Sequence, residues 1–125
     1  MIIKNYQELI VWNKAMDLVS EVYSLTKLLP KEELFALSNQ MRRAAISVPS
    51  NIAEGAGRMA MKERIHFYDI AYGSLTETLC QLEISRDLNY INDEQFSFLE
   101  NIASRISMTL IALKKSLQDK MNKQQ

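Results

Sequence analysis

The chain has 125 residues, 47% of them hydrophobic, which is enough for one domain that folds without a metal or a disulfide. Fifteen basic and fifteen acidic residues cancel, so the overall field does not steer the chain toward nucleic acid or anionic lipid. The one cysteine, Cys80, excludes an internal disulfide, and no segment resembles a secretory signal or a membrane span. We therefore expect a single cytoplasmic domain over residues 1–125, with no cofactor and no membrane partner.

The first predicted helix covers about residues 6–29. Its apolar positions spread over about half of the helix circumference; they are Val11, Trp12, Ala15, Met16, Leu18, Val19, Val22, Tyr23, Leu25, Thr26 and Leu29. A helix with a single neighbour needs only a narrower stripe. This helix is therefore expected to lie between two others or to contact another subunit as well. Pro30 ends it, because the residue before a proline avoids helical geometry.

The second predicted helix covers residues 38–56, with Ser38 as its expected N-cap. Its core stripe has helical spacing and consists of Leu37, Met41, Ala44, Val48 and Ile52. Pro49 falls in the middle of the helix, where it removes a backbone donor and should kink the axis. Gly55 and Gly57 are expected to stop the helix.

Two longer helices are predicted over residues 61–88 and 93–121. The core stripe of the third is Met61, Ile65, Tyr68, Ala71 or Tyr72, Leu75, Leu79 and Leu82, and that of the fourth is Phe96, Leu99, Ala103, Ile106, Leu110, Leu113 and Leu117. Asn92 and Gln95 have the spacing of a capping box that opens the fourth helix. Four helices with short connections predict an all-α fold, an antiparallel up-down-up-down four-helix bundle.

A row of polar residues runs beside the apolar stripe on the second and third helices. Its members are Gln40, Arg43, Ser47, Asn51 and Glu54, followed by Ser74, Thr78 and Gln81. In one interpretation these side chains bond to each other or to another subunit and fix the register. In the other, nearby basic residues hold phosphate oxygens of RNA or DNA; the candidates are Arg42, Arg43, Arg58, Lys62 and Arg64.

Catalytic and metal-binding patterns are weak. Glu63 and His66 match the Glu-x-x-His spacing of di-iron bundles, but such a site needs a second element of this kind, and His66 is the only histidine. Cys80 has no neighbouring histidine to activate it. We therefore expect no metal site and no enzyme activity.

Four groups of residues together resemble a known family. They are Leu9-x-Val11-Trp12-x-Lys14-Ala15; Gln40-x-Arg42-Arg43-Ala44-x-x-Ser47; Asn51-Ile52-Ala53-Glu54-Gly55 with Arg58; and Phe67 with Ala71-x-Gly73-Ser74-Leu75-x-Glu77. The chain resembles the four-helix-bundle proteins encoded in intervening sequences of bacterial 23S ribosomal RNA genes. It departs from the usual pattern at Ala36, where glycine is frequent, and at Met59-Ala60-Met61, where a Ser or Thr cap is common.

The resemblance implies a bundle that commonly assembles into a five-fold ring and has no known enzyme activity. A related branch, the accessory proteins of diversity-generating retroelements, forms similar rings that bind nucleic acid and a reverse transcriptase through basic surface. Our leading hypothesis is therefore a non-enzymatic homo-oligomer, most simply a pentamer, that acts as a scaffold with RNA or DNA contacts. The alternative is an adaptor or regulator that binds an unidentified protein and no nucleic acid.

Overall fold

The structure is a computed structural model that describes residues 6–124, with side chains from residue 9 onward. Its elements are α1 (Tyr6–Thr26), the short 3-10 helix η1 (Lys31–Glu33), α2 (Leu37–Ala56), α3 (Met61–Asp87) and α4 (Asp93–Lys123). No strand occurs in the described part of the chain, so the prediction of an all-helical protein with four main helices is confirmed. None of the helices in residues 6–124 combines the length and hydropathy that a membrane span requires.

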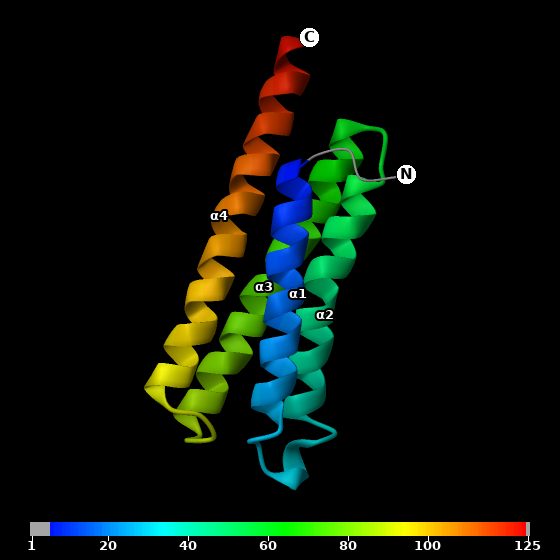
Figure 1. Cartoon of the computed structure of the whole chain (residues 1–125). Coiled ribbons are helices and arrows are strands. Elements are labelled where there is room, and N and C mark those ends of the chain that lie inside the picture. Colours follow the sequence, from blue (N-terminus) through cyan, green and yellow to red (C-terminus); the bar gives the residue numbers. More distant parts are fainter. Residues whose placement is uncertain (1–5, 125) are drawn as a thin grey trace.

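Each long helix packs against two others. Both α1 and α3 lie next to α2 and α4, whereas within the described residues the backbones of α1 and α3, and those of α2 and α4, lie further apart. In Figure 1 the chain runs down α1, back up α2, down α3 and up α4, whose last turns extend beyond the other helices. The helices therefore occupy the four corners of a bundle with the core between them.

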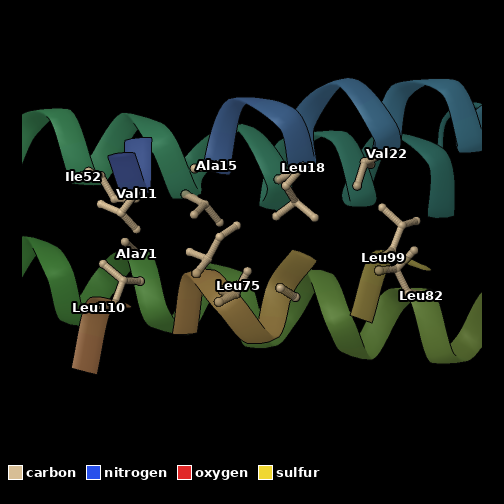
Figure 2. Packing of buried hydrophobic residues seen from close by; sticks show 14 of the residues in the cluster. Val11, Ala15, Leu18, Val22, Ile52, Ala71, Leu75, Leu82, Leu99 and Leu110 are labelled. Carbon is tan, nitrogen blue, oxygen red and sulfur yellow. The ribbon is translucent and has the colours of Figure 1, made fainter. Parts of the chain in front are cut away.

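Most residues of the predicted apolar stripes form the core, whereas Leu37, Met61, Ile65 and Leu79 are only partly buried and pack against it. All seven stripe residues of α4 are buried, as are Met41, Ala44, Val48 and Ile52 of α2. Tyr68 of α3 is the largest fully buried side chain, whereas Tyr72 is 39% exposed, so Ala71 is the core residue of that turn. Figure 2 shows side chains from all four helices, including Leu18, Leu75 and Leu110, pointing into this shared interior.

The broad apolar face of α1 divides into two parts. Val11, Ala15, Leu18, Val22 and Leu25 are buried between α2 and α4. The flanking side chains of Met16 and Tyr23 remain 40% and 38% exposed. The two neighbouring helices thus account for only part of the apolar width of α1, and the remainder lies on the surface.

The helix ends around the α3–α4 connection follow known capping rules. The Asn92 side chain accepts a hydrogen bond from the backbone of Gln95, and the Gln95 side chain accepts one from the backbone of Asn92, both at 2.8 Å; this confirms the predicted capping box. At the end of α3, Asn89 adopts a φ of 63°, and the Tyr90 amide donates to the Ser85 carbonyl over 2.9 Å. This is a Schellman motif with asparagine in the left-handed position.

The predicted end of α1 and the predicted N-cap of α2 are wrong. α1 ends at Thr26 rather than residue 29, because the chain turns early through 3-10-type bonds, including Leu28 N–H to the Leu25 carbonyl at 2.9 Å. Ser38 does not cap α2: the helix starts one residue earlier, with Ala36 at the N-cap, and Ser38 is buried inside the first turn. The connection through η1 leads directly into that turn, so a side-chain cap is not used.

The predicted end of α2 at residue 56 is confirmed, but of the two glycines only Gly57 forms the stop. α2 continues through Gly55, and Gly57 ends it with φ −82° and ψ −7°, so no left-handed glycine is involved. Pro49 lies inside α2 and is buried; the kink expected there stays a prediction.

Gly55 has a packing role instead. A Cβ placed on Gly55 would lie 2.7 Å from Cε1 of Tyr68 and 3.1 Å from Cβ of Phe67. Because Tyr68 is only 1% exposed, its ring has little room to retreat. Gly55 therefore permits the close approach of α2 and α3, which form the most extensive helix pair in the bundle.

We predict that Gly55→Ala destabilises the fold by about 1–3 kcal/mol, because overpacking against Tyr68 outweighs the better helix propensity of alanine. Gly73→Ala is the matched control: it lies inside α3, and a Cβ there meets nothing within 4 Å. It should raise stability by up to about 1 kcal/mol. Urea unfolding, measured where the midpoint does not depend on protein concentration, compares the two. An unchanged or raised midpoint for Gly55→Ala would contradict the packing role.

Candidate nucleic-acid interface

The polar rows of α2 and α3 meet at one level of the bundle. The Ser74 hydroxyl donates a hydrogen bond to the Ser47 hydroxyl over 2.8 Å, across the two helices. Asn51 Nδ2 donates to the Ser47 hydroxyl at 3.0 Å and to the Ser47 carbonyl at 2.8 Å. These three side chains form a continuous network that joins α2 to α3.

Other members of the rows do not bridge the helices. The Thr78 hydroxyl donates to the Ser74 carbonyl of its own helix over 2.8 Å. Gln81 Nε2 donates to Glu77 of the same helix at 3.3 Å, and its buried Oε1 has no hydrogen-bond partner among the described atoms. Gln40, Arg43 and Glu54 are exposed on the outer side of α2. The structure therefore brings together only the central part of the predicted rows.

Contacts fix two arginines at the α2–α3 turn. Arg58 Nη2 lies 2.6 Å from Oε1 of Glu54, and its guanidinium carbon lies 4.9 Å from the centre of the Phe67 ring. Arg64 Nε donates to the Arg58 carbonyl over 2.7 Å. Lys62, between them in the sequence, is exposed. Three cations thus gather at one turn, two of them held in place by protein contacts.

Arg42 has a structural role that the sequence did not indicate. Its Nε donates to the Thr26 hydroxyl over 3.1 Å, and its guanidinium carbon lies 5.2 Å from the centre of the Tyr23 ring. Only 3% of the Thr26 surface is exposed. The sequence pattern placed Thr26 on the apolar face of α1 and gave no sign of this hydrogen bond. Arg42 therefore connects α2 to α1 and is half-buried in doing so.

The five candidate basic residues separate into two groups. Arg42 and Arg43 lie near the start of α2, whereas Arg58, Lys62 and Arg64 lie around its end and the start of α3. Arg43 and Arg58 are fifteen positions apart in the sequence, and at about 1.5 Å per residue the two lie roughly 22 Å apart along the helix axis. The two groups therefore do not form one compact cluster.

The two ends of the bundle differ in charge. The end with the α2–α3 turn also holds the C-terminal turns of α4 (Figure 1), and there residues 54–69 and 114–124 carry seven basic and four acidic residues. At the opposite end, residues 27–43 and 83–100 carry five basic and seven acidic residues. Although the chain has no net charge, one end of the bundle is therefore basic and the other is acidic. The α4 lysines were absent from the predicted set, although the basic stretch after Leu113 could have indicated them.

The remaining candidates for chemistry are scattered. Glu63 and His66 are exposed on α3, and Cys80 is exposed further along the same helix. Among the described side chains, no three His, Cys, Asp or Glu residues gather in a way that could hold a metal ion.

A hydrogen bond between a tyrosine and a carboxylate lies at the acidic end. The Tyr90 hydroxyl donates a hydrogen bond to Oε2 of Glu33 over 2.9 Å. This bond joins the loop between α3 and α4 to η1. This hydrogen bond to a carboxylate, with a smaller contribution from desolvation, raises the pKa of Tyr90. Because the folded-state pKa is raised, the contact stabilises the fold at pH values below the usual tyrosine pKa of about 10 and is lost as the phenol ionises above it.

We predict that Ser47 and Ser74 are energetically coupled. In a double-mutant cycle of Ser47→Ala and Ser74→Ala, the coupling free energy should be about 0.5–1.5 kcal/mol, as expected for one partly buried hydrogen bond. The control pair is Ser47→Ala with Thr76→Ala, because the exposed Thr76 hydroxyl bonds only to its own helix, at the Tyr72 carbonyl. Urea unfolding of all the variants gives both couplings. Additive effects of Ser47→Ala and Ser74→Ala would contradict the bridging role.

Comparisons with known proteins agree with this architecture. A family model described as 23S rRNA-intervening sequence protein matches residues 7–112. A crystal structure of a protein of unknown function from the S23 ribosomal protein family of Bacteroides thetaiotaomicron VPI-5482 is similar, with a TM-score of 0.81 and 27% sequence identity over 87% of this chain and 98% of that chain. No curated protein matches the chain. Because the family model spans most of the sequence, the chain belongs to the 23S rRNA-intervening sequence protein family.

Proposed function

We propose that the protein is a non-enzymatic scaffold of the cytoplasm that assembles into a ring, most simply a pentamer, and contacts RNA or DNA through the basic end of each subunit. In this proposal each subunit is one antiparallel up-down-up-down bundle, with α2 kinked at Pro49. The alternating course of the chain in Figure 1 and its short helix connections support the antiparallel arrangement. The ring itself is expected from the resemblance to the family.

The nucleic-acid part of the proposal is based on the residues of the basic end. Arg64 is held at the α2–α3 turn by its hydrogen bond to the Arg58 carbonyl, so its guanidinium group loses little further freedom when it meets a phosphate. Arg58 is ion-paired with Glu54, so a phosphate there would share the guanidinium group with that carboxylate. Lys62 is exposed beside them, and Lys115, Lys120 and Lys123 follow on α4. A neutral chain can bind a polyanion in this way if its cations gather at one end.

The other predicted cations fit this role less well. Arg42 is half-buried and engaged with Thr26 and Tyr23, so binding a phosphate would break its contact between α1 and α2. Arg43 is exposed but belongs to the end where acidic residues outnumber basic ones. We therefore place the contact with phosphate at Arg58, Lys62 and Arg64.

A second function, binding of a partner protein, is favoured by a separate apolar cluster. Phe35 is 90% exposed in the α1–α2 connection, and Leu34 and Leu28 in the same connection are 44% and 55% exposed. An aromatic side chain presented on a protein surface is a common anchor for a protein partner. Since this cluster lies at the acidic end, it is separate from the proposed phosphate contacts.

The nucleic-acid proposal is tested by titrating labelled structured RNA and duplex DNA at about 50 and 200 mM salt. Lys62→Gln removes one exposed charge at the basic end, and Arg43→Gln is the matched control at the acidic end. Binding should weaken with salt, and Lys62→Gln should reduce the slope by roughly one counterion, whereas Arg43→Gln should keep the wild-type slope.

Two results would count against this assignment. If neither nucleic acid binds at the lower salt concentration, the nucleic-acid role fails and the protein-binding alternative takes its place. A partner protein should then bind the wild type in a stoichiometric complex and should not bind the Phe35→Ser variant. If Arg43→Gln reduces the slope as much as Lys62→Gln, binding occurs but is not placed at the basic end.

A further inference from the structure

We propose that copies of this chain associate head to tail, with the outer face of α1 and α2 in one copy covering the outer ridge of α3 in the next. The inference rests on the ring assembly proposed above and names the two surfaces that would form it. We call them the α1–α2 face and the α3 ridge.

The α1–α2 face is mainly apolar and none of the residues that define it is acidic, while the exposed Glu54 follows directly after its member Ala53. On α1 its apolar members recur at spacings of four, three and four; they are Trp12, Met16, Val19 and Tyr23, and Ile46 and Ala53 continue the face on α2. Ile46 is 41% exposed, similar to Met16 and Tyr23. The neutral side chains of Asn13, Ser20, Ser24, Asn39 and Ser50 fill the positions between them. Depletion of charge together with aromatic residues and Met is the composition of an interface core.

Two of the polar side chains on this face are bonded within their own helices. Asn13 Nδ2 donates to the Leu9 carbonyl over 2.9 Å, and the Ser50 hydroxyl donates to the Ile46 carbonyl over 2.8 Å. Because each of these two side chains already has one bond within its own helix, covering them costs less than covering side chains without a partner.

The α3 ridge carries a glycine that the subunit itself does not explain. The ridge consists of Ile70, Gly73, Glu77, Cys80 and Ile84, at spacings of three, four, three and four, and all five are exposed. Glycine inside a helix costs about 1 kcal/mol relative to alanine. At Gly55 the neighbouring Tyr68 explains that cost, but a Cβ on Gly73 would meet nothing within 4 Å. Gly73 forms a notch in the ridge, open to another molecule.

The two surfaces lie at the same height in the bundle. The hydrogen bond between Ser47 and Ser74 places these residues level with each other. Because α2 and α3 run in opposite directions, the adjacent Ile46 and Gly73 differ in height by about 3 Å, at roughly 1.5 Å per residue. If neighbouring subunits stand side by side with parallel axes, Ile46 of one copy comes nearly opposite the Gly73 notch of the next. A contact between two different surfaces is heterologous, the type that closes into rings.

Charge supports the same alignment. The cations at the edge of the α1–α2 face, Lys27 and Arg43, lie toward the end of α1 and the start of α2. On α3 the anions Glu77 and Asp87 lie in the second half of the helix, toward the same end of the bundle. With parallel axes the cationic edge of one copy therefore meets the anionic end of the next ridge. A second copy covers both surfaces at once, whereas a foreign helix would leave one of them exposed.

The test uses two variants that each disable one surface. Ile46→Glu places a charge in the α1–α2 face, and Gly73→Gln fills the notch; Met59→Glu, at an 87% exposed apolar residue outside both surfaces, is the control. Circular dichroism verifies that each variant is folded. By native mass spectrometry, each of the two should be monomeric at concentrations where wild type and Met59→Glu are assembled. An equimolar mixture should form a dimer, because Ile46→Glu keeps an intact ridge and Gly73→Gln keeps an intact face.

The outcomes separate this inference from the proposed function. If both variants assemble like wild type, or if the mixture of monomeric variants forms no dimer, the pairing of these surfaces is overturned while the ring assembly stands. If wild type is itself monomeric throughout, the ring assembly fails and the inference with it.

Discussion

The close approach of α2 and α3 is the constraint on which the rest of the structure depends. Gly55 allows it at one end, where any side chain would collide with the buried ring of Tyr68. The hydrogen bond between Ser47 and Ser74 fixes the register near the middle. Once this pair is set, α1 and α4 each contact one member of it and complete the core from the other side. The same register determines which exposed residues share a height on the outside of the bundle.

Much of the fold follows from the sequence because apolar spacing is a local property. The α4 stripe and the Asn92–Gln95 capping box are both found where the pattern places them. The errors occur where a tertiary contact decides. Gly55 has the sequence context of a helix stop, but its role depends on Tyr68, thirteen positions further along the chain. Arg42 looks like a free cation until the fold brings Thr26 and Tyr23 to it.

The candidate interface was only partly predictable for the same reason. The sequence identified Arg58, Lys62 and Arg64 and the two polar rows. The net charge of the chain, however, does not tell where the charged side chains lie in the folded protein. Folding brings the end of α4 to the same end of the bundle as the α2–α3 turn (Figure 1), so a chain with no net charge acquires a basic end. This distribution separates the proposed functions in space: phosphate contacts at one end, the Phe35 cluster at the other, and subunit contacts along the sides.

Self-association is the central claim, since it would give the exposed apolar part of α1 a function and would repeat the basic end around a ring. Sedimentation equilibrium of the unmodified chain over a wide concentration range tests it most directly. The account predicts one species with a mass of five times 14.4 kDa that persists on dilution. A species of 14.4 kDa at every concentration, in particular at micromolar concentration and above, would contradict it.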